Sequence, residues 1–154
     1  MRWERGSFWL TDDTGCVDTA RVHALLQDSY WARGMPLSVL ETAVAHSLCF
    51  SLFEDHHAGR RQIGFARVIT DRATFGYLSD VIVDPACRGQ GLCKWMMACI
   101  MAHPQLQGFR RWSLATRDAH GLYRQFGFTE QKHPDWFMEI HRPDVYPSTP
   151  VVSS

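Results

Sequence analysis

The sequence has no surplus of charge of either sign, since 16 lysines and arginines balance 16 aspartates and glutamates. Nucleic-acid-binding domains carry a basic surplus or a basic patch, so we expect no nucleic-acid partner. The sequence also has no apolar run near the ~20 residues that a membrane-spanning helix requires, and it does not begin like a secretory signal. We therefore expect no membrane partner, and at 154 residues we expect one domain.

Cysteine pairs and zinc-ligand patterns are missing as well. The five cysteines are scattered, at Cys16, Cys49, Cys87, Cys93 and Cys99, and their spacing fits neither a disulfide framework nor a zinc site. Free thiols suit a reducing compartment, so we expect a cytoplasmic protein. The eight histidines add no ligand set to these cysteines, and we expect no metal.

The stretch from Tyr77 to His103 reads as a strand, a glycine-rich turn and a helix. Residues 78–83 are short, apolar and rich in β-branched side chains, with Asp80 as the one charge among them. Pro85 ends the strand because proline cannot donate to a β-ladder. From Leu92 onward the apolar residues recur at helical spacing. This stretch organises the rest of the chain.

The turn between the strand and the helix predicts an anion-binding site. Gly89 and Gly91 let the backbone approach a ligand closely, and the free N–H groups of the helix's first turn point outward. Arg88 and Lys94 add positive charge on either side. The turn lacks the spacing of a Walker A loop, and Lys94 stands where a dinucleotide fingerprint needs its third glycine. The pattern therefore favours a phosphate or pyrophosphate of another kind of ligand.

Two segments resemble the GNAT family of N-acetyltransferases. Arg88-x-x-Gly91-x-Cys93 is similar to the family's acetyl-coenzyme A loop, Arg/Gln-x-x-Gly-x-Gly/Ala, from which Cys93 departs at the last position. Residues 119–128 resemble the family's Ala-x-x-x-Tyr-x-x-x-Gly-Phe segment, with Tyr123 as its tyrosine. The two segments follow one another in the family's order.

The resemblance implies a fold and a co-substrate, acetyl-CoA. The expected fold is α/β (α+β): a mixed, largely antiparallel central sheet of six to seven strands, flanked by helices on both faces. In the family the organising strand and the next one splay apart around the pantetheine arm, and a bulge near 79–81 would expose main-chain groups to that arm. The expected cofactor-binding residues are Val81, Ile82, Val83, Arg88, Gly89, Gln90, Gly91, Leu92, Cys93, Lys94 and Thr116.

Two side chains are the candidate catalytic residues. The family's match makes Tyr123 the general acid that protonates the departing thiolate, and the alternative is a tyrosine packed on a helix face. Asp80 is the candidate base, acting directly or through a water. Its alternatives are a charge on the exposed face of the sheet or an ion-pair partner for an arginine.

Four further side chains near these segments have open roles. Thr116 stands where many family members carry an asparagine that contacts the cofactor arm, and a hydroxyl replaces part of that contact. Asp118 or His120 are alternative helpers, although His120 suits a helix cap or a surface position equally well. For Cys93 a covalent acyl-enzyme is the chemical alternative to a small packed residue.

The acceptor is the least determined part of the function. Aromatic walls for an aliphatic chain or a cation are expected from Tyr30, Trp31 and Trp136. A primary amine of a small molecule is the expected acceptor, acetylated directly in a ternary complex, with a protein lysine or N-terminus as the alternative. A non-catalytic acyl-CoA-binding sensor or interaction module is the alternative of another class. The oligomeric state is open between a monomer and a homodimer.

The remaining segments give the expected layout of the chain. Strands are expected over 7–11, 49–53, 62–70, 74–83, 112–116 and 137–140, and helices after Asp18, over 37–47, from Leu92 and around Tyr123. Residues 1–143 are expected to form one domain, and 144–154, rich in proline and serine, a C-terminal tail.

Overall fold

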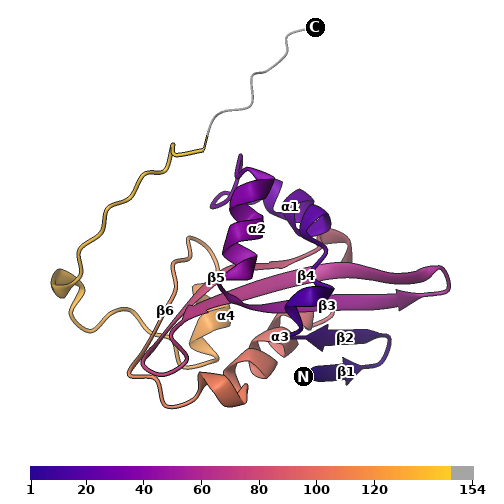
Figure 1. Cartoon of the computed structure of the whole chain (residues 1–154). Helices are drawn as coiled ribbons and strands as arrows, with labels where there is room; N and C mark the ends of the chain where they lie inside the picture. The colour runs from indigo at the N-terminus through magenta and orange to yellow at the C-terminus, as the bar shows by residue number, and fades with distance from the viewer. Residues whose placement is uncertain (147–154) are drawn as a thin grey trace, which may run out of the picture.

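The computed structural model describes residues 1–146, and within them the strands form one six-stranded sheet in the order β1-β2-β3-β4-β5-β6 (Figure 1). Neighbours pair antiparallel from β1 to β5, and β5 pairs with β6 in parallel. The expected mixed, largely antiparallel sheet is confirmed. The strands are β1 (Arg2–Arg5), β2 (Phe8–Thr11), β3 (Leu48–His56), β4 (Gly59–Thr70), β5 (Phe75–Val83) and β6 (Arg111–Ser113).

Helices cover both faces of this sheet, as expected. The α-helices are α1 (Thr19–Gln27), α2 (Leu37–Ala45), α3 (Leu92–Met101) and α4 (His120–Arg124), and the 3-10 turns are η1 (Thr14–Cys16), η2 (Pro85–Cys87), η3 (Pro104–Leu106) and η4 (Pro134–Trp136). Apolar residues of α1 and α2 pack with Phe65 and Ile82 on one face. Those of α3 pack with Phe50 and Leu78 on the other, where Tyr123 of α4 also lies.

A β-bulge interrupts β5 at the place where the family resemblance allowed one. The β4–β5 register runs Phe65↔Ile82 and then Arg67↔Ser79, so that Ala66 opposes two residues of β5. Asp80, one of those two, has φ +53°. Because of the extra residue, Leu78 packs with the α3 side of the core while Ile82 packs with the α1–α2 side.

The β5–β6 pair separates early. Its register ends at Tyr77↔Ser113, although β5 continues to Val83. On this side the second half of β5 has no strand partner within residues 1–146. The expected splaying of the two strands is therefore confirmed, and it leaves a row of main-chain groups open.

The prediction of a final strand over 137–140 is wrong for the described chain. These residues belong to no strand, and Met138 and Ile140 are 98% and 85% exposed. Three of these four residues are apolar, which suits a strand, but a strand also needs a neighbouring strand to pair with. The expected tail begins within the described residues, where Tyr146 packs beside α1 and α2; residues 147–154 lie outside them.

A buried imidazole–carboxylate pair joins β2 to the end of α3. His103 is buried, and its Nδ1 accepts the backbone N–H of Gln105, so its Nε2 donates to Asp12 at 2.8 Å. Burial raises the pKa of Asp12, but hydrogen bonds from the Met1 ammonium and His103 outweigh this and hold that pKa below its ordinary 3.8. The carboxylate is therefore the stable form in the folded protein.

We expect Asp12→Ala to lower the free energy of unfolding by about 1–3 kcal/mol, because it leaves a buried imidazole N–H without an acceptor. The pKa of Asp12 is depressed by folding, so its contribution is present above the unfolded pKa and is lost as the pH falls through the folded value. The difference from wild type should therefore narrow in acid. Denaturant titrations across pH measure it, with Glu4→Ala on exposed β1 as control; equal effects of both variants at neutral pH contradict the assignment.

Candidate active site

The loop before α3 presents unbonded main-chain donors. Gly91 is the N-cap of α3 with φ +70°, and Gly89 has φ +83°; both values lie in the left-handed region that favours glycine. Within residues 1–146 the N–H groups of residues 89–94 donate no hydrogen bond. A Cβ added at Gly89 would meet no atom within 4 Å, so the space beside the loop is open. Such a row of donors at a helix N-terminus is suited to a phosphate group.

Three cations surround this loop, and one of them was not found from the sequence. Arg88 and Lys94 are exposed on either side, as the sequence indicated. Arg5 of β1 is the third: its guanidinium donates to the carbonyl oxygens of Gln90 and Gly91, each at 3.2 Å. Because Arg5 binds the carbonyl side of these peptides, it leaves their N–H groups free. No local signal marks Arg5, since 86 residues separate it from Gly91.

The predicted residues Val81, Ile82 and Val83 lie on the unpaired half of β5, next to that loop. Ile82 and Val83 are buried and hold the strand in the core, while their main-chain groups form the edge that β6 leaves open. An extended chain can bind such an edge as an added strand does. The bulge, the unpaired half of β5 and the loop at residues 89–94, which we call the donor loop, therefore follow one another along the chain.

The structure pairs Asp80 with an arginine. Its Oδ2 accepts from Arg67 Nε at 2.5 Å and its Oδ1 from Trp31 Nε1 at 3.0 Å, and the residue is 5% exposed. In the structure Asp80 is therefore the ion-pair partner of an arginine, which was one of the alternatives to its role as the base. Each carboxylate oxygen has a second lone pair, so these two contacts leave acceptor capacity at both.

Tyr123 of α4 is half-buried and packs against the apolar cluster on the α3 side of the sheet. Its ring packs against Phe128 at a centroid distance of 6.0 Å. Its hydroxyl makes no hydrogen bond within residues 1–146, and burial first, then the nearby Cys93, Tyr30 and Asp118, raise the pKa of the phenol well above its ordinary value. The phenol therefore stays protonated at neutral pH, as a proton donor must be.

Two other predicted positions have local explanations. Burial raises the pKa of the Cys93 thiol, although Arg88 opposes the rise, so the thiolate that an acyl-enzyme requires is disfavoured. Thr116 Oγ1 accepts the backbone N–H of Ala119 at 3.0 Å and so holds the turn that leads into α4. Its own O–H remains able to donate.

Two of the three predicted acceptor-site aromatics lie together beside the bulge of β5. Tyr30 and Trp31 pack edge to face at 5.0 Å, and Trp31 reaches Asp80. The Tyr30 hydroxyl accepts the backbone N–H of Arg117 at 2.8 Å, so the segment between α1 and α2 is tied to the turn after β6.

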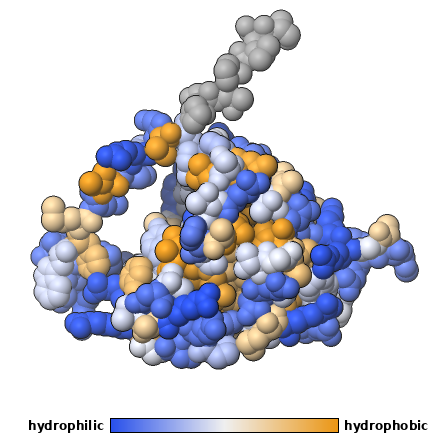
Figure 2. Space-filling view, in the orientation of Figure 1, coloured by the Kyte–Doolittle hydropathy of each residue, from blue (hydrophilic) through white to orange (hydrophobic). Residues whose placement is uncertain are grey.

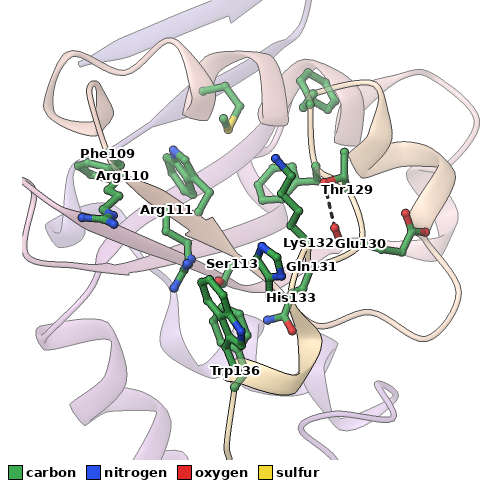
Figure 3. A pocket seen from close by; sticks show the side chains of 16 residues that line it. Phe109, Arg110, Arg111, Ser113, Thr129, Glu130, Gln131, Lys132, His133 and Trp136 are labelled. Atoms are coloured by element: carbon green, nitrogen blue, oxygen red, sulfur yellow. Dashed lines mark hydrogen bonds between the residues drawn. The ribbon is translucent and has the colours of Figure 1, made fainter.

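The third aromatic lies elsewhere. Trp136 stacks on His133 at 4.0 Å and lines a hollow of about 410 Å³ together with Arg111 and Ser113 of β6 (Figure 3). The structure therefore does not bring Trp136 together with Tyr30 and Trp31.

The part of the chain that the structure describes contains no group of three or more side chains able to hold a metal ion. None of the helices in that part is both long enough and apolar enough to cross a membrane.

Known proteins share this arrangement. The family model of the acetyltransferase (GNAT) domain matches residues 45–130. A GNAT-family crystal structure from Xanthomonas campestris pv. campestris is 47% identical, with a TM-score of 0.86, over 92% of this chain and 97% of that one. A Gibberella zeae protein named as an acetyltransferase is 30% identical over 142 residues, or 80% of this chain and 79% of that protein.

A more distant structure shows the same fold with its ligand. The Clostridium acetobutylicum protein, solved with acetyl-CoA, has a TM-score of 0.60 at 13% identity, over 92% of this chain and 96% of that one. The chain therefore belongs to the GNAT family of acetyltransferases.

Proposed function

We propose that this protein moves an acetyl group from acetyl-CoA to a primary amine of a small molecule, by direct transfer in a ternary complex. The observation that carries the proposal is the row of unbonded N–H groups at residues 89–94, which begins α3 beside the open edge of β5. The donors and the helix dipole suit a diphosphate, and the cations Arg88 and Lys94 add to the attraction. The open edge of β5 suits the amide groups of a pantetheine arm.

The residues of the cleft fit the proton transfers of this reaction. Acetyl-CoA supplies an activated thioester carbonyl and a thiolate leaving group. In the reaction the amine nitrogen forms a bond to that carbonyl carbon while the carbon–sulfur bond breaks. Tyr123 Oη donates its proton to the departing sulfur, and the amine's proton passes to the Asp80 carboxylate, directly or through a water. Holding amine and thioester in line removes a further part of the barrier.

The contacts of Tyr30 favour a small acceptor. The hydrogen bond from the Arg117 N–H to the Tyr30 hydroxyl ties the α1–α2 segment to the turn after β6, and the Arg117 guanidinium lies over the Tyr30 ring at 4.1 Å. This bridge restrains the segment that is expected to line the acceptor site. Tyr30 and Trp31 still expose part of their rings, which suits an aliphatic amine or its cation.

The test of the proposed function is the release of free thiol from acetyl-CoA in the presence of an amine library. Acetylation of one or more small amines, identified by the mass of the product, is the expected result. Binding of acetyl-CoA without thiol release across the library contradicts the proposal and favours a sensor module. Release only with peptide lysines or N-termini favours the protein-acetylating alternative.

Gly91→Asp should weaken the binding of coenzyme A at least ~10-fold, because a carboxylate at the start of α3 repels the diphosphate and crowds the loop. Calorimetric titration with coenzyme A measures this. Gly108→Asp is the matched control, since Gly108 also has φ in the left-handed region, +75°, with no atom near an added Cβ. Equal affinities for the Gly91 variant and wild type would place the diphosphate elsewhere.

Tyr123→Phe should lower kcat by about 10²-fold while the affinity for coenzyme A changes little, because the variant keeps the packing on Phe128 and loses only the donor. The raised pKa of Tyr123 adds a pH signature. Activity that depends on the protonated phenol is lost only as the pH rises through this raised value, so the alkaline limb of kcat should lie above the ordinary phenol pKa. Unchanged turnover by the variant removes Tyr123 from the mechanism.

Asp80→Asn should lower kcat by roughly 10²-fold while the affinity for coenzyme A changes little, because an amide keeps an acceptor for Trp31 but cannot take up a proton. The matched comparison is Arg67→Gln, which removes the ion-pair partner and keeps the carboxylate. If the Asn variant keeps the wild-type kcat and loses only thermal stability, Asp80 acts by positioning Trp31 and Arg67 rather than as the base.

A further inference from the structure

Arg117, in the turn after β6, is held twice by one side chain. Its backbone N–H donates to the Tyr30 hydroxyl at 2.8 Å, and its guanidinium lies over the ring of the same tyrosine at 4.1 Å. An arginine stacked on an aromatic ring keeps the N–H groups at the edge of its guanidinium free to donate. The contact with Tyr30 therefore fixes the position of this charge without using its hydrogen bonds.

The charge of Arg117 is not neutralised within residues 1–146. The residue is exposed, and its guanidinium makes no ion pair and donates no hydrogen bond in this part of the chain. Asp118, the next residue, does not pair with it either. A planar guanidinium that is held in place with its edge free is suited to bind a carboxylate or a phosphate through two parallel hydrogen bonds.

A short series of contacts joins Arg117 to the proposed catalytic residues. The Tyr30 ring meets the Trp31 ring edge to face at 5.0 Å, and Trp31 Nε1 donates to Asp80 Oδ1 at 3.0 Å. Tyr30 also lies near Tyr123, since after burial it is among the groups that raise the pKa of that phenol. The two rings are 41% and 42% exposed, so they form an accessible surface that extends from Asp80 to Arg117.

The segment that carries these two rings is fixed by its own hydrogen bonds. Ser29 Oγ donates to the Leu26 carbonyl at 2.7 Å and accepts the Ala32 N–H at 3.1 Å. At the other end of the segment His23 Nε2 donates to the Met35 carbonyl oxygen at 2.7 Å. A site whose groups are already held in place loses little conformational entropy when a ligand binds.

We propose that the acceptor amine carries an anionic group, a carboxylate or a phosphate, which the Arg117 guanidinium binds while an aliphatic spacer lies on Tyr30 and Trp31. This role of Arg117 rests on the proposed acetyl transfer, since the spacer would place the amine beside Asp80 and Tyr123. Figure 2 shows apolar and hydrophilic residues interspersed on the face of the molecule that carries α1 and α2, which suits a ligand with both kinds of group. A polyamine would instead bring a second positive charge towards Arg117 and should bind weakly.

Calorimetric titration of the protein saturated with coenzyme A tests this role without turnover, because coenzyme A has no acetyl group to transfer. For each spacer length the ligands are an ω-amino carboxylate, an aminoalkyl phosphate and the uncharged ω-amino carboxamide. At the best spacer length one of the two anionic amines should bind at least ~10-fold more tightly than the carboxamide, and salt should reduce this preference because Arg117 is exposed. The tighter of the two anionic amines identifies the group as carboxylate or phosphate. Equal affinities of charged and uncharged ligands at every length, or no binding of any anionic amine, overturn the proposal.

Variants assign the preference to Arg117. Arg117→Gln should abolish it while the affinity for coenzyme A changes little, and Arg117→Lys should restore part of it, because lysine keeps the charge and loses the planar fork. The matched control is Arg110→Gln, which should keep the preference, since Arg110 is also exposed and without an ion pair among residues 1–146. If Arg117→Gln weakens the binding of coenzyme A and leaves the preference intact, Arg117 serves the coenzyme and the proposal is wrong.

The same ligands separate this proposal from the proposed function. Acetylation of charged and uncharged amines at equal kcat/KM would overturn the role of Arg117 and leave the acetyl transfer standing. No acetylation of any amine would overturn the acetyl transfer, whereas the titrations with coenzyme A would still show whether Arg117 binds an anionic group.

Discussion

The ion pair between Arg67 and Asp80 fixes the place where β5 departs from a regular ladder. A non-glycine residue at positive φ costs of order 1–3 kcal/mol, and a buried carboxylate without a partner costs still more. Arg67 and Trp31 satisfy that carboxylate, so the bulge persists in the core. The extra residue then turns the second half of β5 so that Val81 and Val83 share a face with Leu78, and this half is the part that β6 leaves open.

Local signals in the sequence were enough to predict the donor loop and its surroundings. Each of these signals involves only a few neighbouring residues, and the structure shows all of them: a positive φ at Gly91, the end of β5 before Asp84-Pro85, and a helix from Leu92. Contacts between distant segments have no such signal. Arg5 on the loop and Trp31 on Asp80 join positions separated by 86 and 49 residues, and only the folded sheet brings them together.

The predicted strand boundaries were wrong where the extent of a strand depends on the strand that it pairs with. The sequence predicts a strand over 112–116, but β6 ends at Ser113 because β5 diverges after Tyr77. At 137–140 the residues are mostly apolar and suit a strand, yet no neighbour within the described chain pairs with them. In both cases the pattern describes which residues are able to form a strand, whereas the ladder is a property of two segments.

The contacts of Arg5 have an electronic consequence for the loop. A carbonyl and the N–H of the following residue belong to one peptide group, so a cation on the Gln90 carbonyl acts on the Gly91 N–H, and one on the Gly91 carbonyl acts on the Leu92 N–H. A peptide whose oxygen accepts a charged hydrogen bond becomes a stronger donor at its nitrogen. The N-terminal hairpin therefore polarises two peptide groups of the loop from behind, and a charge in β1 tunes their acidity without touching any anion in front of them.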